Sequence, residues 1–510
     1  MIKHLYILLF LLGTILVVGQ PNPQSKKITN DFFPDYNELL EITPALKKKK
    51  GFTNYEELMT FLTDLKNKFP DKMEIKFIGE SQKGYKTPIV FLNSGKKNNL
   101  KVWFKGGLHG NEPAGTEGLL YLLDRLLNDS SLKYLLDNTN LAILPMANID
   151  GSIKQNRYAS NGLDLNRDQT KLMAIESIAI KQAFTDFNPD IAVDFHEYRP
   201  YRKDFARMSD FGITSVYDVM FLYSGNLNVP QNIRIITDTL FVKNARSVVQ
   251  SYGLKHHDYM STTKHLGEIH FNQGSTNARS SATSYALNNT ISTLIEIRGV
   301  GIGKTSFKRR VNSAFSIALS YLKTSFENSD FIKSELKKSL NYNSSDIVVT
   351  SSRTVEKEMI QTIDLNSNKI IDYEVTIRDA LRSNPTLIRD RPLGYLILKE
   401  NIELIEKLRV LGLEINTIQN DSVMKVEKFK ITNYNDNFEK YEKMNLQSVK
   451  ASLVKDEITV KQGTYLILTN QRASNILTEL LEPEAPNSFV SFGILRTEIN
   501  QILPIYRLIN

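Results

Sequence analysis

The stretch Gly106-Gly107-Leu108-His109-Gly110-Asn111-Glu112-Pro113-Ala114-Gly115 decides the fold. An apolar segment, residues 100–104, precedes it, and a helical pattern of leucines follows Pro113. Proline fits the first position of a helix, where its missing N–H costs nothing. The sequence therefore predicts a strand, a tight glycine-rich turn and a helix, with His109 and Glu112 in the turn.

His109 and Glu112 offer an imidazole and a carboxylate at the carboxyl end of the predicted strand. Zinc accepts both ligand types, and a catalytic zinc has three protein ligands and one open position. A single His-x-x-Glu also occurs by chance on solvated surfaces, so a third ligand is needed. His196 follows the apolar run 190–195 and completes the set. The sequence predicts one zinc ion held by His109, Glu112 and His196.

The composition is that of a globular chain with more than one domain. The 510 residues exceed one ordinary core, and 41% are hydrophobic and 24% charged. There is no cysteine, which excludes disulfides, cysteine nucleophiles and cysteine ligands. The net charge of +8 is spread along the chain, and no nucleic-acid-binding module is visible in the sequence.

Residues 1–20 are predicted to be a secretory signal peptide. A basic start is followed by an apolar run, residues 5–18, that is too short to cross a bilayer. We expect cleavage after Gly19 or Gln20, secretion or transfer to the periplasm, and no membrane span in the processed chain. An uncleaved anchor is the alternative. Residues 21–50 are polar and rich in lysine, and we expect a mobile N-terminal segment there.

Apolar runs alternate with helical patterns between residues 51 and 326. Three of these runs end at polar residues: 141–147, 190–195 and 293–297. This alternation favours an α/β catalytic domain with a mixed, mostly parallel sheet and flanking helices. The texture becomes polar at residues 327–345, which predicts a boundary there. A smaller α+β accessory domain is expected at 345–510, without a catalytic constellation of its own.

Polar side chains collect at the ends of the predicted strands, where ligands bind in open α/β sheets. Glu296 ends one apolar strand and is the candidate general base. A salt bridge between Glu296 and Arg298 is the structural alternative, and strand alternation allows both roles. Arg157 and Arg167 supply cations that bind carboxylates or stabilise an oxyanion. Asp164 is a candidate partner for the second ring nitrogen of a histidine ligand.

Five short segments follow one another along the chain in a distinctive order and spacing. They are His109-Gly110-Asn111-Glu112, Asn148-Ile149-Asp150-Gly151, Gly162-Leu163-Asp164-Leu165-Asn166-Arg167, Asp194-Phe195-His196-Glu197 and Leu294-Ile295-Glu296-Ile297-Arg298-Gly299. Together they resemble the M14 family of zinc carboxypeptidases over about residues 52–325. Ile149 replaces the family's proline, and Asp168 stands where familiar members have asparagine. The C-terminal part resembles extensions of some secreted bacterial members.

The resemblance implies an α/β catalytic domain, one zinc ion, and peptide or protein C-termini as substrates. It implies that Asn166 and Arg167 bind the substrate's terminal carboxylate. It further implies that Arg157 polarises the scissile carbonyl and that Glu296 acts first as general base and then as general acid. Tyr285 is the candidate for the tyrosine that caps the substrate.

Two other functions use the same ligand set or the same fold. A zinc amidase or deacylase would act on cell-wall peptides or small acylated amino acids. An inactive binding module would keep the fold without the metal, but all three ligands and the candidate base are present. The sequence sets neither an oligomeric state nor a preferred side chain beside the scissile bond. The length of the first domain favours a peptidase, because it has room for a full substrate cleft.

Overall fold

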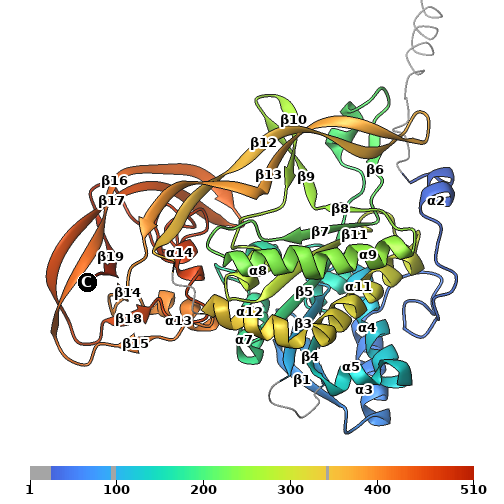
Figure 1. Ribbon diagram of the computed structural model, residues 1–510, viewed down its shortest axis with the longest axis horizontal. Coiled ribbons are helices and arrows are strands. Elements are labelled where there is room, and N and C mark those ends of the chain that lie inside the picture. The colour runs from blue at the N-terminus through green and yellow to red at the C-terminus, as the bar shows by residue number, and fades with distance from the viewer. Residues whose placement is uncertain (1–23, 93–98, 341–343) are drawn as a thin grey trace, which may run out of the picture.

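A computed structural model describes residues 24–92, 99–340 and 344–510, so the predicted signal peptide lies outside the described residues. The largest feature is an eight-stranded sheet in the order β1-β2-β4-β3-β5-β11-β7-β8 (Figure 1). In that order the strands are Met73–Glu80, Lys86–Leu92, Thr139–Leu144, Leu100–Gly106, Ile191–Tyr198, Ile291–Arg298, Val219–Tyr223 and His256–Asp258. The four central strands β4, β3, β5 and β11 are parallel, whereas β1, β2 and β7 pair antiparallel with their inner neighbours. The mixed, mostly parallel sheet predicted from the sequence is therefore confirmed.

Helices cover both faces of this sheet. On one face pack α4 (Pro113–Asn128) and α11 (Phe307–Glu327), with α9 (Lys243–Ser251) beside α11. On the other pack α7 (Ile175–Phe187) and α10 (Ser281–Ala286). The alternation of β3 explains the division: Val102 and Phe104 join the cluster under α4 and α11, and Trp103 joins the cluster under α7. As predicted, α4 begins at Pro113.

Shorter elements complete this part of the chain. The helices are α2 (Lys26–Phe32), α3 (Tyr55–Lys68), α5 (Lys133–Asp137), α6 (Ile149–Lys154), α8 (Gln231–Ile236) and α12 (Ser329–Leu340). Short 3-10 helices occupy Ser130–Leu132, Leu165–Arg167 and Lys203–Arg207. A π-helix occupies Thr237–Val242. Among the described residues, no helix is long and apolar enough to span a bilayer.

The described part of the N-terminal segment, residues 24–50, packs against the domain that contains the eight-stranded sheet. The sequence predicted a mobile segment there instead. Glu117 of α4 is buried and accepts hydrogen bonds from Thr43 Oγ1 at 2.5 Å and from the Ala45 amide at 2.7 Å. Phe33 and Leu39 of the segment are also buried. The lysine-rich composition predicted solvent contact, but the few apolar residues between the lysines fix the path of the chain.

A five-stranded sheet in the order β6-β12-β13-β10-β9 connects distant parts of the sequence. Its strands are β6 (Ile213–Ser215), β12 (Asp346–Asp364), β13 (Lys369–Asp390), β10 (Glu268–Gln273) and β9 (Met260–His265). The long β12–β13 hairpin runs across the top of the view in Figure 1. It pairs with β10 on one side and with β6 on the other. The boundary predicted at residue 345 therefore needs correction, because the hairpin completes a sheet with strands of the first part.

The rest of the chain forms a six-stranded sheet in the order β15-β18-β14-β19-β16-β17. Its elements are β14 (Gly394–Ile397), α13 (Ile402–Val410), β15 (Asn416–Thr417), β16 (Ser422–Tyr441), β17 (Met444–Val460), β18 (Tyr465–Leu468), α14 (Ile476–Leu481) and β19 (Ile502–Leu508). This is the α+β C-terminal domain that the sequence predicts. The β16–β17 hairpin reaches back to the catalytic part at its tip, as described below.

Candidate active site

Three side chains converge at the carboxyl ends of β3 and β5. His109 and Glu112 come from the turn between β3 and α4, and His196 from the end of β5. One ligand atom of each lies within 4.8 Å of the others, and all three side chains are buried. The Nδ1 atoms of His109 and His196 are 3.0 Å apart, and Glu112 Oε1 lies 2.8 Å from His109 Nδ1. These are the three residues that the sequence predicts as metal ligands.

Glycine at position 110 allows the turn to pack this tightly. A Cβ on Gly110 would lie 1.9 Å from the carbonyl carbon of Gly151, so the turn rests directly on the backbone at the start of α6. Asn148 holds that backbone, because its Oδ1 accepts a hydrogen bond from the Gly151 amide at 2.9 Å. The Asn-x-Asp-Gly segment thus supports the His-x-x-Glu turn from below.

A carboxylate lies behind each histidine. Asp164 Oδ1 is 3.0 Å from His109 Nε2, and Asp194 Oδ2 is 2.9 Å from His196 Nε2. Such partners fix the tautomer and orientation of histidine ligands. Both rings therefore turn Nδ1 toward Glu112, and two imidazoles with one carboxylate form a donor set that fits zinc. The sequence analysis named Asp164 but missed Asp194, although strand alternation places Asp194 and His196 on the same face of β5.

A cleft of about 530 Å³ opens over this cluster. Four residues predicted to act on the substrate line it together with His109: Arg157, Asn166, Arg167 and Glu296. In the sheet, Glu296 of β11 is the register partner of His196 of β5, so both reach the same edge. Burial raises the pKa of the Glu296 carboxyl to about 7, and the Glu112 charge adds to this rise.

Arg298 does not form the predicted alternative salt bridge. Its guanidinium donates to the Ser215 carbonyl and to Gln24 Oε1, and it stacks on the ring of Phe33 at 3.9 Å. These contacts leave the Glu296 carboxylate without an arginine partner on its own strand.

Comparison with known proteins agrees with this geometry. The sequence profile of the zinc carboxypeptidases, peptidase family M14, matches residues 58–190. Carboxypeptidase 2 of Trichophyton rubrum is 30% identical over 445 residues, which cover 84% of this chain and 81% of that protein. The chain belongs to the zinc carboxypeptidase family. It is a zinc metallocarboxypeptidase.

Two further matches cover different shares of the chain. Carboxypeptidase 2 of Trichophyton equinum is 29% identical over 441 residues and covers 84% of this chain and 81% of its own length. The solved structure of carboxypeptidase A from Helicoverpa armigera aligns with a TM-score of 0.43 at 16% identity, over 56% of this chain and 78% of that one.

In this carboxypeptidase Tyr285 does not line the cleft, which corrects its predicted role as the capping tyrosine. Its ring is 1% exposed and stacks on Phe184 of α7, with ring centres 3.9 Å apart. Its hydroxyl accepts a hydrogen bond from Lys105 Nζ at 3.1 Å. Helix α10 turns this face toward the sheet, so Tyr285 belongs to the core. Tyr259, which the sequence analysis missed, lines the cleft instead.

The loop that carries Arg157, Asp164 and Asn166 is held in several directions. Arg157 donates from Nη2 and Nε to Asp164 Oδ2 at 2.8 and 3.0 Å. The Asn166 side-chain oxygen accepts a hydrogen bond from the Ser281 amide at 2.9 Å. Arg167 donates from Nη1 to the carbonyl of Asn166 at 2.9 Å. Because this loop is fixed by charged contacts, its cationic groups are preorganised before substrate arrives.

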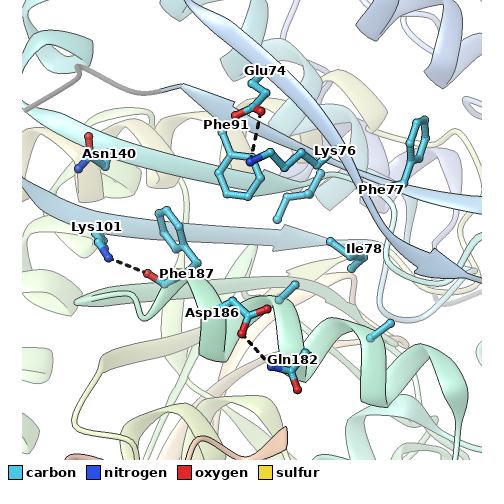
Figure 2. A pocket seen from close by; sticks show the side chains of 13 residues that line it. Glu74, Lys76, Phe77, Ile78, Phe91, Lys101, Asn140, Gln182, Asp186 and Phe187 are labelled. Carbon is cyan, nitrogen blue, oxygen red and sulfur yellow. Dashed lines mark hydrogen bonds and ion pairs between the residues drawn. The ribbon is translucent and has the colours of Figure 1, made fainter. Parts of the chain in front are cut away.

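A second and larger pocket, of about 690 Å³, lies between the outer strands and α7 (Figure 2). Its charged groups are paired locally: Lys76 lies 3.2 Å from Glu74, and Asp186 accepts a hydrogen bond from Gln182 at 2.7 Å. Its lining contains no histidine, and the only metal-ligand cluster found in the described ranges lies elsewhere. This pocket therefore lacks the metal-ligand cluster of the first cleft.

Proposed function

We propose that this carboxypeptidase removes the last residue of peptides or proteins, with Glu296 as the group that moves protons. The observation that carries the proposal is the position of Glu296 at the edge of one cleft with His109, Arg157 and Arg167. Carboxypeptidases act on free C-termini, which require a cation for the carboxylate and an electrophilic centre for the carbonyl. The cleft offers both.

His109, Glu112 and His196 would hold the zinc ion. When bound, zinc supplies Lewis acidity, which polarises a carbonyl and makes water a stronger acid. Glu296 accepts the proton of the attacking water as its oxygen bonds to the carbonyl carbon. It then donates that proton to the amine nitrogen as the peptide C–N bond breaks. A carboxyl with a pKa raised to about 7 by burial can both take and return a proton near neutral pH.

Asn166 and Arg167 would bind the terminal carboxylate, and Arg157 would stabilise the negative charge that develops on the carbonyl oxygen. Arginine suits the first role because its planar fork binds both carboxylate oxygens. Tyr259 replaces Tyr285 as the candidate for capping the substrate. The burial of Tyr259 raises the pKa of its phenol, and the Glu296 charge adds to this rise, which supports a position beside the proposed base.

The test is Glu296→Gln assayed on peptides with free and amidated C-termini. We expect the variant to keep its zinc and to lose roughly 10²- to 10⁴-fold in kcat, the usual contribution of a positioned proton-transfer group. The wild type should release single residues from free C-termini only. Activity of Glu296→Gln within about tenfold of wild type would refute the role. Equal cleavage of amidated peptides would instead favour an amidase or deacylase.

We further propose that the enzyme is exported through removal of residues 1–20. The apolar run at residues 5–18 after a basic start supports this. N-terminal sequencing of protein from the native host should find a start near Gln20. Unprocessed chain in the cytosol would contradict it.

A further inference from the structure

The substrate cleft carries more positive charge than the binding of one terminal carboxylate requires. This inference rests on the proposed function, and the surplus charge indicates the class of substrate. The cleft is lined by six arginines and two glutamates: Arg157, Arg167, Arg199, Arg202, Arg279 and Arg353, with Glu197 and Glu296. Its lining contains neither lysine nor aspartate. A cleft lined by one sign of charge concentrates ligands of the opposite sign.

The two glutamates do not neutralise this charge. Glu197 is committed elsewhere, since its Oε1 accepts from Arg310 Nε at 2.7 Å and its Oε2 accepts from the Ala114 amide at 3.1 Å. Glu296 has the role of proton transfer. Among the described residues, Arg157 is the one of the six arginines with carboxylate partners, Asp164 at 2.8 Å and Glu112 at 3.4 Å.

Four arginines remain after Arg157 and Arg167 have been assigned. Arg353 of β12 donates from Nη1 to the carbonyls of Gln273 and Arg378, each at 3.0 Å. For Arg199, Arg202 and Arg279, the part of the chain that the structure describes provides no ion pair with a carboxylate. Arg199 is exposed, whereas Arg202 and Arg279 are half-buried, and half-buried cations without an ion pair are costly unless a ligand supplies the anion. The surplus therefore points to a second anionic group on the substrate.

Arg279 is joined by backbone contacts to the loop proposed to hold the terminal carboxylate. Two residues after it, the Ser281 amide donates to Asn166 Oδ1 at 2.9 Å. The carbonyl of Arg279 itself accepts from the Gln169 amide at 3.3 Å. These two bonds tie Arg279 to the loop that carries Asn166 and Arg167. The side chain of a substrate's last residue branches from the same α-carbon as the terminal carboxylate, so it must lie close to this loop.

The guanidinium of Arg279 is held from the other side by the C-terminal domain. Its central carbon lies 4.9 Å from the ring centre of Tyr441, at the tip of the β16–β17 hairpin. Burial lowers the pKa of Arg279, and the charge of Arg167 lowers it further. A carboxylate placed between Arg279 and Arg167 would relieve this repulsion, whereas an apolar or basic side chain would not.

We propose that the cleft selects peptides whose last residue is glutamate or aspartate, and that Arg279 binds this side-chain carboxylate. Arg199, Arg202 and Arg353 extend the positive field along the cleft and favour acidic residues before the last one. Glutamine has the shape of glutamate without its charge, so the pair separates charge recognition from size.

The first experiment uses the full-length zinc enzyme and peptides that differ only in the last residue: glutamate, glutamine, lysine or phenylalanine. We expect kcat/KM for glutamate to exceed that for glutamine by tenfold or more, mainly through KM, with lysine last. The preference should weaken as salt is raised. If glutamine or phenylalanine is released as well as glutamate, the acidic preference is refuted while the carboxypeptidase stands. If zinc is bound but no peptide loses its last residue, the proposed function itself is refuted.

The second experiment tests Arg279 directly. Arg279→Gln should reduce the glutamate-to-glutamine ratio to within about threefold, and Arg279→Lys should restore part of it. Arg279→Glu should reverse the order and favour lysine. Arg409, exposed on α13, provides the control Arg409→Gln, which should leave the ratio unchanged. An unchanged ratio in Arg279→Gln would refute the assignment of Arg279, and the peptide series on the wild type stays decisive if a variant fails to fold.

Discussion

Buried carboxylates behind the proposed zinc ligands orient the histidine rings of this candidate site. Asp194 connects three elements, since its Oδ2 accepts from Ser281 Oγ at 2.5 Å and from Lys105 Nζ at 3.1 Å besides facing His196. Lys105 in turn donates to Tyr285. The orientation of His196 therefore depends on groups from β3, β5 and α10 together, not on its own strand alone.

We predict that Asp194→Asn weakens zinc binding by roughly 10- to 100-fold, the usual cost of losing such a partner. An amide offers one acceptor where the carboxylate now serves a histidine, a serine and a lysine, and it leaves Lys105 buried without its counter-charge. Competition with a metal chelator measures the affinity. Asp186→Asn, on the exposed side of α7, is the matched control and should bind zinc as the wild type does. Unchanged affinity in Asp194→Asn would show that the carboxylate is dispensable.

Lys181 gives the molecule a pH-dependent stability. Burial and, to a smaller extent, the charge of Lys105 lower the pKa of this lysine to about 7. A lysine whose pKa is lower in the folded state is penalised fully below about pH 7, and the penalty disappears as the pH rises toward about 10.4, its unfolded value. Three pKa units correspond to roughly 4 kcal/mol.

We therefore expect the free energy of unfolding of the wild type to rise, relative to Lys181→Met, between about pH 7 and pH 10. Denaturant titrations at several pH values measure the difference. Lys337→Met, at an exposed lysine of α12, should run parallel to the wild type. A constant difference between the wild type and Lys181→Met across this range would contradict the prediction.

At the scale of elements, the sequence predicted the strands and helices that depend on short-range patterns. The strand, turn and helix around His109 and the strand that ends near Glu296 follow from apolar periodicity and from proline and glycine positions. Tyr285 could not be placed this way, because the face that a short helix presents depends on its packing. The long β12–β13 and β16–β17 hairpins were not predicted, and the strands β10, β6 and β19 that pair with them lie far away in the sequence.

The tip of the β16–β17 hairpin reaches the loop that carries Arg157, Asp164 and Asn166. Glu442 Oε2 accepts a hydrogen bond from the Asp164 amide at 2.8 Å, and Lys443 Nζ donates to the carbonyl of Asn161. These contacts hold the segment that carries Arg157 and Asn166. An element of the C-terminal domain thus takes part in positioning the proposed substrate-binding groups.

We predict that Glu442→Ala raises KM by about tenfold with little change in zinc content, since a hydrogen bond to a charged group is worth about 1.5–3 kcal/mol. Steady-state kinetics with metal analysis measures both. Glu457→Ala, exposed on β17, is the control and should have no effect. Loss of zinc together with activity would show instead that the hairpin supports the whole site and not only the loop that carries Arg157 and Asn166.

At the scale of the whole molecule, the two parts share one core. The largest apolar cluster contains Leu58 and Leu119 of the first part together with Leu404 and Ile476 of the last. Buried polar contacts cross the same junction: Lys407 Nζ donates to the carbonyl of Lys171 at 2.8 Å, and Asn226 Nδ2 donates to Glu479 Oε1 at 2.6 Å. The sequence predicted a separately folding domain because composition reports polarity along the chain and not which surfaces meet.

We therefore predict that a chain ending at residue 345 does not fold by itself. Removing β12 and β13 leaves the edges of β10 and β6 unpaired, and removing α13 and α14 exposes apolar side chains that now complete the core. The full-length protein should unfold in one cooperative transition, with calorimetric and van't Hoff enthalpies in agreement. A soluble chain of residues 24–345 that binds zinc and unfolds cooperatively would restore the independent catalytic domain, whereas aggregation or a molten state would assign residues 346–510 to the folding unit of the active site.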